Sequence, residues 1–218
     1  MLEIVKLTLG PVQTNAYLIA DQDSGDAAVI DPAWDGTRIL AVAKEKSWNV
    51  RHLWYTHAHF DHIGGAAEVA DNCKLIPLVA LHPADHNLWK AGGGGSYFGF
   101  SIDPGPEPDI DLNDDQILML GKVEIKVLHT PGHTPGHCAF YAASDSVLFS
   151  GDLIFQNSVG RTDLSGGDFD TLVKSIQEKV FPLPDDTRIL SGHGPETTVG
   201  WEKINNPFVN QNSTGRFI

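Results

Sequence analysis

Apolar and polar residues follow strand-like spacing in two separate blocks, and segments with helix-like spacing come after the strands. Alternation with a period of two, or a short apolar run between turn residues, is typical of strands, whereas apolar positions three and four apart are typical of helices. Strands are expected at residues 2–9, 16–20, 27–31, 51–55, 75–80, 116–120, 122–128, 138–142, 147–150 and 188–191. Helices are expected at residues 36–46, 64–72, 83–90, 169–180 and 197–203.

These two blocks of strands predict the fold class. The first three strands resemble an antiparallel meander, and residues 116–128 resemble a hairpin around Gly121. Two sheets packed face to face, with helices outside, would bury the apolar residues of both blocks. We therefore expect an α/β protein with a four-layer αββα sandwich. The 218 residues fit a single domain over residues 1–209, followed by a loose tail at 210–218 that has no core residues.

Composition and charge exclude several classes of protein. A net charge of −13 argues against binding to nucleic acid or anionic membranes, because both need clustered lysine and arginine. No apolar run approaches a membrane span and the N-terminus does not resemble a leader, so a cytoplasmic protein is expected. Cys73 and Cys138 are expected to be buried free thiols. The acidic run at 109–115 lacks the glycine and distal glutamate of a calcium loop and is interpreted as a solvated turn.

The segment from Thr56 to Gly65 contains the most informative cluster of polar residues. It holds three histidines and an aspartate within six residues, namely His57, His59, Asp61 and His62. The cluster lies where strand 51–55 stops and a helix starts, a place where side chains can converge. Neutral imidazoles suit zinc, iron or manganese, and a carboxylate adds a harder ligand. The segment therefore predicts a metal site.

Three more polar residues directly follow predicted strands and adjoin glycine or proline: His133, Asp152 and His193. If the four strands concerned lie side by side, their loops open at one edge of the sandwich and gather five histidines and two aspartates. Seven ligands exceed what one zinc ion takes, and they suit two ions. Spacing alone leaves the ligand among His129, His133 and His137 open.

The motif H-x-H-x-D-H at residues 57–62, followed in order by His133, Asp152 and His193, resembles the metallo-β-lactamase superfamily over nearly the whole chain. The resemblance implies an αββα sandwich of two mixed β-sheets and two divalent metal ions, with zinc expected and iron or manganese as alternatives. It also implies which residues bind each ion: His57, His59 and His133 the first, Asp61, His62 and His193 the second, and Asp152 both.

Segments 130–136, 160–163 and 192–198 are similar to the glyoxalase II-like (hydroxyacylglutathione hydrolase-like) branch, and residues 206–208 to its short bacterial subgroup. This implies hydrolysis of a small-molecule thioester by a hydroxide that bridges the metals, with Asp61 as the catalytic residue that orients the water or relays its proton. Full glyoxalase II carries a C-terminal helical domain that supplies basic residues for glutathione. Only about 25 residues follow His193 here, so the glutathione site does not carry over.

Substrate-binding residues are less well defined. Residues 91–108 contain four consecutive glycines followed by three aromatic residues. This segment forms either a flap at the edge of a pocket or a plain surface loop. A flap would make Tyr97, Phe98 and Phe100 candidate substrate-binding residues. Arg161 either pairs with Asp163 to hold a loop or helps to position the substrate.

The other histidines have simpler interpretations. His82 and His86 would share a helix face, but the intervening residues lack the glutamate of an H-E-x-x-H motif, so an exposed helix is favoured. His52 is expected to pack within its strand. His129 and His137 are expected at strand ends, as partners of the ligands. Asp168 is expected to cap the helix at 169–180.

Three alternative functions stay open. A mono-iron persulfide dioxygenase belongs to a related branch with a segment like residues 160–163. Another hydrolase of the superfamily would act on lactones, β-lactams or phosphodiesters. A metal-holding scaffold would have no hydrolytic activity. Covalent catalysis is not supported, because the sequence has no G-x-S-x-G motif and no cysteine beside a candidate base.

Overall fold

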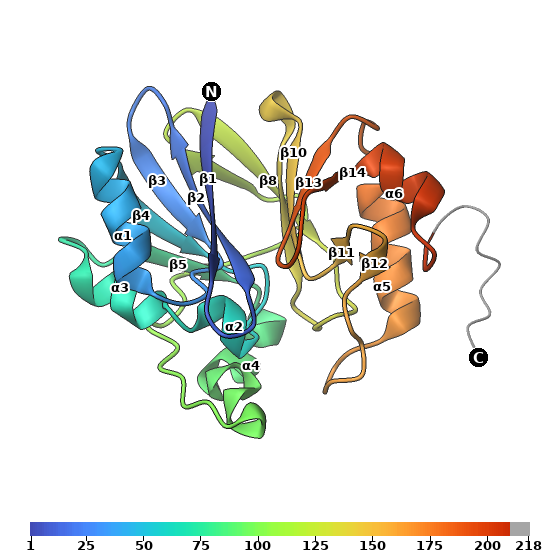
Figure 1. Cartoon of the computed structure of the whole chain (residues 1–218), viewed down its shortest axis with the longest axis horizontal. Helices are drawn as coiled ribbons and strands as arrows, with labels where there is room; N and C mark the ends of the chain where they lie inside the picture. The colour runs from blue at the N-terminus through green and yellow to red at the C-terminus, as the bar shows by residue number, and fades with distance from the viewer. Residues whose placement is uncertain (210–218) are drawn as a thin grey trace.

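Two six-stranded sheets pack face to face in the computed structural model, which describes residues 1–209. Helices cover the outer face of each sheet, α1 and α3 on one side and α5 and α6 on the other (Figure 1). The expected αββα sandwich is therefore confirmed. The tail expected at 210–218 lies outside the described residues. No helix in residues 1–209 has the length and apolar character needed to cross a membrane.

The first sheet combines an antiparallel half and a parallel half. Its strands in order are β1 (Leu2–Leu9), β2 (Thr14–Asp21), β3 (Asp26–Ile30), β4 (Asn49–Trp54), β5 (Leu78–Leu81) and β6 (Ile110–Asp111). The expected meander is confirmed, because β1, β2 and β3 pair antiparallel. Strands β3 to β6 then pair parallel to one another.

The second sheet is also mixed. Its strands in order are β14 (Thr197–Thr198), β13 (Arg188–Ser191), β10 (Val147–Gly151), β9 (Cys138–Ala142), β8 (Val123–His129) and β7 (Ile117–Leu120). Strands β7 to β10 pair antiparallel, including the expected hairpin, and β10 pairs parallel with β13. A separate two-stranded sheet pairs β11 (Ile154–Phe155) with β12 (Ser158–Val159).

Four of the expected helices are shorter than the sequence pattern predicts, and the helix expected at 197–203 lies at 199–205, after the short strand β14. The α-helices are α1 (Gly36–Glu45), α2 (Phe60–Ile63), α3 (Ala66–Asn72), α4 (His86–Lys90), α5 (Phe169–Ser175) and α6 (Val199–Asn205). Three segments of 3-10 helix lie at Pro83–Asp85, Gly92–Phe98 and Ala143–Asp145, and a π-helical turn at Ile176–Val180 extends α5. Asp168 caps α5 as expected, since its carboxylate accepts a hydrogen bond from the Thr171 amide.

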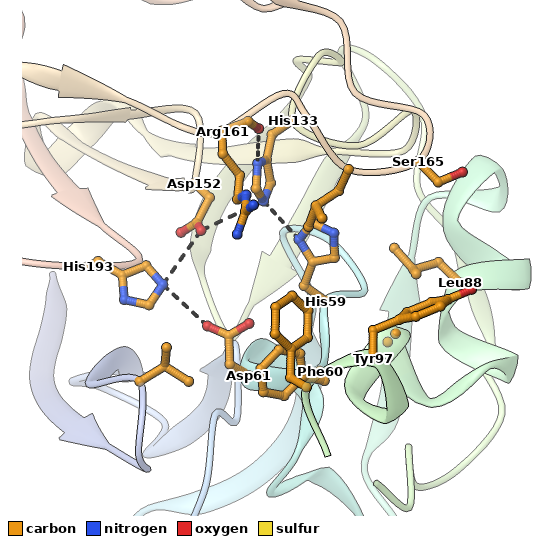
Figure 2. A pocket seen from close by; sticks show the side chains of 15 residues that line it. His59, Phe60, Asp61, Leu88, Tyr97, His133, Asp152, Arg161, Ser165 and His193 are labelled. Carbon is orange, nitrogen blue, oxygen red and sulfur yellow. Dashed lines mark hydrogen bonds and ion pairs between the residues drawn. The ribbon is translucent and has the colours of Figure 1, made fainter. Parts of the chain in front are cut away.

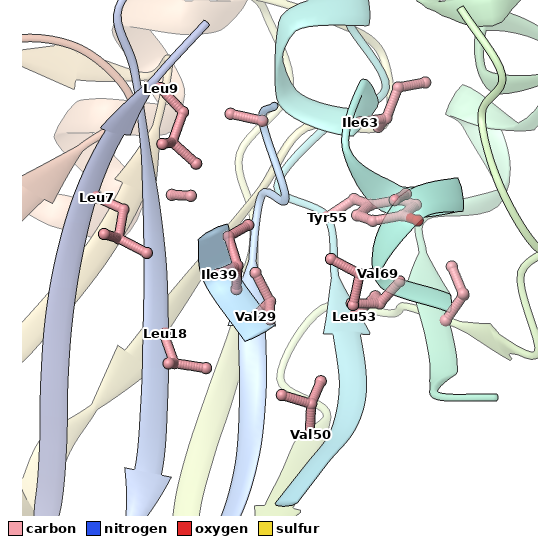
Figure 3. Packing of buried hydrophobic residues seen from close by; sticks show 14 of the residues in the cluster. Leu7, Leu9, Leu18, Val29, Ile39, Val50, Leu53, Tyr55, Ile63 and Val69 are labelled. Carbon is pink, nitrogen blue, oxygen red and sulfur yellow. The ribbon is translucent and has the colours of Figure 1, made fainter. Parts of the chain in front are cut away.

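Three apolar layers account for the uninterrupted apolar runs in the strands. One layer packs α1 and α3 on the first sheet, where Ile39 and Val69 meet Leu18 and Leu53 (Figure 3). The second lies between the two sheets, and the third packs α5, α6 and the π-helical turn on the second sheet. Because central strands are buried on both faces, they read as continuous apolar segments.

Three local expectations were wrong. The strand expected at 75–80 starts at Leu78, and Leu75 and Ile76 are 64% and 71% exposed. The acidic run at 109–115 is not simply a solvated turn, because it contains β6 and the fully buried Leu112. Cys138 is buried as expected, but Cys73 is partly exposed.

The four strands that precede the candidate ligands do not all lie side by side, although β10 and β13 are neighbours. β4 belongs to the first sheet, and β9 separates β8 from β10 in the second. The loops still meet, because β8, β10 and β13 run in the same direction and the two sheets touch at this edge. There the Cys138 amide donates to the Thr56 carbonyl, and the Asn15 amide donates to the Gly192 carbonyl.

Candidate metal centre

The histidine motif folds as the sequence predicts, where a strand passes into a helix. After β4 a short loop with a bend at Thr56 leads to His59, whose backbone is extended at the N-cap position of α2. His57 and His59 therefore lie in this loop, whereas Asp61 and His62 lie in the single turn of α2. All four side chains are buried, His57 and His62 completely. The change from strand to helix within six residues lets them face one region.

Three imidazoles converge in the first group of candidate ligands. The Nδ1 atom of His59 lies 2.9 Å from the Nε2 atom of His133, which lies 3.2 Å from the Nε2 atom of His57. Figure 2 shows the His59 and His133 rings facing each other across the cavity floor. A single cation between these nitrogens could contact all three.

Asp61, His62 and His193 form the second group. The Oδ2 atom of Asp61 is 3.5 Å from the Nε2 atom of His62 and 3.3 Å from the Nε2 atom of His193. The Thr14 hydroxyl donates to the same carboxylate oxygen over 2.8 Å. These three ligand atoms are also close enough together to hold one ion.

Asp152 lies between the two groups. Its Oδ1 atom is 3.3 Å from the Nε2 atom of His62, and its Oδ2 atom is 3.7 Å from His133 Nε2 and 3.5 Å from His193 Nε2. Gly192 permits this approach, because a Cβ atom there would come within 2.3 Å of the Asp152 carboxylate. The structure thus brings all seven residues expected from the sequence to one place.

Hydrogen bonds behind the rings fix which ring nitrogen is free. The Nδ1 atom of His62 donates to the Asp31 carboxylate over 2.9 Å, and the Nδ1 atom of His133 donates to the Arg161 carbonyl over 2.7 Å. The Thr56 hydroxyl donates to Asp31 and so accepts from the Nδ1 atom of His57. Each of these rings therefore turns its Nε2 lone pair toward the centre, as metal-binding histidines do.

The electrostatic balance keeps one group neutral and the other charged. Burial and neighbouring imidazoles lower the pKa of His59 to about 3 and lower the pKa of His57 as well. Burial alone would lower the pKa of His62, but the carboxylates around it raise it. Burial likewise opposes ionisation of Asp61, but His62 and His193 lower its pKa to about 2. Burial would lower the pKa of His193 too, but the same carboxylates raise it to about 9. Ionised carboxylates and unprotonated imidazoles are the forms that bind metal, so an ion bound by the second group would displace the protons of His62 and His193.

Two buried ligand atoms have no hydrogen-bond partner among the described residues. They are the Nε2 atom of His62 and the Oδ1 atom of Asp152. Buried polar atoms are nearly always paired, so an unpaired nitrogen and oxygen that face each other call for an unplaced partner. A divalent cation satisfies both, and the donor set of imidazoles and carboxylates fits such an ion.

A cavity of about 280 Å³ opens above the ligands (Figure 2). Its apolar wall includes Phe60, Leu88, Tyr97 and Phe98. Phe60 holds the 92–98 segment in place, since its ring stacks on Phe98 at 5.3 Å and on Phe100 at 5.2 Å. The segment therefore forms one edge of the pocket, not a plain surface loop, and Tyr97 and Phe98 reach the cavity as expected while Phe100 supports them.

Arg161 forms the expected pair with Asp163 and also lies at the cavity. Its side chain lines the cavity and forms a two-point ion pair with Asp163, with both contacts at 2.7 Å. Its carbonyl also accepts the hydrogen bond that orients His133. The Arg161 side chain is about half exposed, so the ion pair itself contributes little to stability.

The remaining histidines lie outside the ligand groups. His137 supports the centre as expected, since its Nε2 atom accepts a hydrogen bond from the Asp152 amide. His129 contacts the Pro135 carbonyl and stacks on His82 at 4.1 Å. His86 pairs with Asp111 over 3.3 Å. His52 packs beside Trp54 in β4, as expected.

Three residues that support the candidate ligands were not predicted from the sequence: Asp31, Thr14 and Asp85. Asp31 could have been found, because it follows an apolar strand and precedes a proline, the same context as the candidate ligands. Thr14 and Asp85 carry no such local pattern. Their roles depend on contacts with residues 27 to 51 positions away in the chain.

Comparison with known proteins identifies the family. The family model described as the metallo-beta-lactamase superfamily matches residues 9–193. The chain belongs to the metallo-beta-lactamase superfamily. This confirms the resemblance inferred from the motif and agrees with the two mixed sheets flanked by helices.

Relatives within the superfamily cover nearly the whole chain. The hydroxyacylglutathione hydrolase GloC of Haemophilus influenzae is 37% identical over 214 residues, which span 97% of this chain and 99% of GloC. The crystal structure of the B3 metallo-beta-lactamase BLEG-1 is similar with a TM-score of 0.88 and 39% identity, covering 96% of this chain and 99% of BLEG-1. The di-iron-bound form of TTHA1623 is similar with a TM-score of 0.85 and 38% identity, covering 94% of this chain and 99% of TTHA1623.

Proposed function

We propose that this superfamily member is a metal-dependent hydrolase of small-molecule thioesters that uses two divalent cations. One observation carries the proposal: two groups of ligand atoms share Asp152 and form the floor of a cavity whose wall is largely apolar. Zinc is the expected metal. The similarity to the di-iron-bound form of TTHA1623 makes iron the main alternative.

The ligand assignment follows the two groups in the structure. His57, His59 and His133 would hold one ion, Asp61, His62 and His193 would hold the other, and Asp152 would contact both. When bound, such a pair lowers the pKa of a water molecule toward neutrality and stabilises negative charge that develops on the substrate. The unpaired atoms of His62 and Asp152 support this assignment.

The chain's own residues would orient the reactants. Thr14 donates to one oxygen of Asp61 and fixes that carboxylate at the cavity floor. Asp61 can then orient the attacking water and take up its proton, the catalytic role expected from the sequence. Tyr97 and Phe98 would contact the apolar part of the substrate, and Arg161 would contact a polar or anionic end.

Thioesters are the favoured substrate class because GloC, which is named as a hydroxyacylglutathione hydrolase, aligns over nearly its full length. The cavity is less suited to binding the glutathione part of such a substrate. Arg161 is the sole lysine or arginine lining the cavity in the described part of the chain, and it is already paired with Asp163. We therefore expect thioesters with a compact thiol to be hydrolysed at least as well as glutathione thioesters.

The test combines elemental analysis of the purified protein with turnover of a thioester, lactone, β-lactam and persulfide panel. We expect two metal equivalents per chain and the highest kcat/KM on a thioester. Asp152→Ala should lose metal and lower kcat/KM at least 100-fold.

Other outcomes would replace the proposal. Preferential β-lactam hydrolysis would favour a lactamase, the candidate that the similarity to BLEG-1 supports. Oxygen consumption with a persulfide, together with one iron per chain, would show a dioxygenase. Full turnover by metal-depleted Asp152→Ala protein would refute metal-dependent hydrolysis altogether.

A further inference from the structure

Asp85 is a completely buried carboxylate outside both ligand groups. It ends the 3-10 turn at Pro83–Asp85, directly after the loop that leaves β5. Burial raises its pKa, and hydrogen-bond donors around it act in the opposite direction. A carboxylate in such a position is costly unless its oxygens are well satisfied, so its partners indicate what it does.

All three donors to Asp85 come from the two loops that carry the first group of imidazoles. Its Oδ2 atom accepts from the Ala58 amide over 3.1 Å and from the Thr134 hydroxyl over 2.8 Å. Its Oδ1 atom accepts from the Gly136 amide over 2.7 Å. Ala58 separates His57 from His59, and Thr134 directly follows His133.

These contacts leave the two loops little freedom to move apart. A Cβ atom at Gly136 would come within 2.7 Å of the Asp85 carboxylate and 2.8 Å of its amide nitrogen, so the 130–137 loop packs directly against the turn. Hydrogen bonds to an ionised acceptor are also stronger than those between neutral groups. One carboxylate therefore joins two loops whose histidines, His57 and His133, are 76 positions apart in the chain.

The same turn leads straight into the aromatic wall of the cavity. α4 starts at the next residue and carries Leu88, and the 92–98 segment that follows carries Tyr97. This segment lies tightly on the histidine loop, because a Cβ atom at Gly93 would come within 2.3 Å of the Phe60 amide nitrogen. Figure 2 shows Leu88 and Tyr97 facing the cavity beside His59.

We propose that Asp85 is a positioning residue that holds His57, His59 and His133 in their converging arrangement and ties the aromatic wall to the same loops. The inference rests on the ligand assignment of the proposed function and is independent of the substrate. Asp31 supports both groups, His62 directly and His57 through the Thr56 hydroxyl, whereas Asp85 contacts the loops of the first group. Loss of Asp85 should therefore lower the affinity for the ion held by the three imidazoles. The affinity for the ion held by Asp61, His62 and His193 should not change.

The experiment measures metal affinity without substrate, by cobalt(II) titration and competition with a chelator. In a His193→Ala background, which disables the second group, Asp85→Asn should weaken cobalt binding 10- to 100-fold. In a His59→Ala background, which disables the first group, Asp85→Asn should change affinity less than threefold. Asp21→Asn is the matched control, since Asp21 is also buried, accepts hydrogen bonds from the Asp23 and Lys122 amides, and lies at the far end of β2 from the ligands.

A second pair of variants keeps the test decisive if Asp85→Asn does not fold. Thr134→Val removes the hydroxyl donor with little change of shape, and Thr134→Ser keeps the hydroxyl. We expect the valine variant to weaken cobalt binding in the His193→Ala background and the serine variant to restore it. Equal loss in both backgrounds, or a lower melting temperature with unchanged affinity, would show that Asp85 is merely structural and overturn the inference. Because no substrate is used, failure of the thioesterase proposal would appear separately.

Discussion

Replacing Asp31 with asparagine tests whether hydrogen bonds behind the ligand rings set their protonation. The Asp31 carboxylate accepts three donors: the Thr56 amide at 2.7 Å, the Thr56 hydroxyl at 2.7 Å and the Nδ1 atom of His62 at 2.9 Å. An asparagine amide cannot accept all three. If its oxygen faces the Thr56 amide, its NH₂ group faces His62, whose proton must then move to Nε2, the atom that should bind the metal.

The opposite orientation of the asparagine amide is no better, because its NH₂ group then opposes the Thr56 N–H group. Either way one hydrogen bond to a charged acceptor is lost, at a cost of about 1.5–3 kcal/mol. At about 1.4 kcal/mol for each factor of ten, this predicts a loss of metal affinity of about 10- to 100-fold. Burial of the site gives no route for water to replace the missing acceptor, since Asp31 is only 2% exposed.

Chelator competition on the purified Asp31→Asn protein measures this loss directly. Asp21→Asn is the matched control, because Asp21 is equally buried, accepts from the Lys122 and Asp23 amides, and lies at the far end of β2 from the ligands. Unchanged affinity in Asp31→Asn, or an equal loss in Asp21→Asn, would refute the idea that Asp31 fixes the ring protonation.

Two further predictions concern the cavity wall and the loss of folding stability at acid pH. Arg161→Ala should raise KM about tenfold with little change in kcat. Asp163→Asn frees the Arg161 guanidinium and should lower KM for an anionic thioester. A fall in kcat alone would contradict a role of Arg161 in substrate binding. Burial and the neighbouring His129 lower the pKa of His82 from 6.5 to about 4. As the pH is lowered from 6.5 to about 4, the unfolded chain therefore takes up a proton that the folded chain does not, and the stability of the fold should fall. His82→Asn, which can still accept the Ala84 amide, should flatten this part of a denaturation profile measured against pH, and an unchanged slope would contradict the cause given.

The fold and the ligand cluster could be predicted from the sequence because both leave local patterns. The ligand loops follow apolar runs, and Asp152 and His193 adjoin glycine, so these loops were recognisable without knowing how the strands pair. His133 was distinguished from His129 and His137 by the resemblance to the family motif. The pairing itself was not predictable. Strand order depends on contacts across the whole chain, and β9 lies between β8 and β10 although the loops still meet.

Short elements were missed where tertiary contacts override local preference. The acidic segment around Ile110 looks like a solvated turn, yet it forms β6 because β5 offers a parallel edge and Leu112 enters the core. Conversely, Leu75 and Ile76 look like the start of a buried strand but remain exposed. Nothing in the neighbouring residues distinguishes these cases, since each depends on what lies opposite in space.

The groups missed at the centre share a physical reason for being there. Seven ligands at one edge create crowded lone pairs and like charges, which would repel one another in the absence of a cation. The chain opposes this with buried acceptors and donors behind the rings: Asp31 at Thr56 and His62, and Asp85 at the flanking loops. Each acceptor satisfies backbone and side-chain donors at once. Asp85 thereby joins loops from the two sheets, whereas Asp31 joins the ends of β3 and β4 within the first sheet. Because Asp31 supports both groups and Asp85 contacts the loops of the first group, the separate variants can show which group each carboxylate positions.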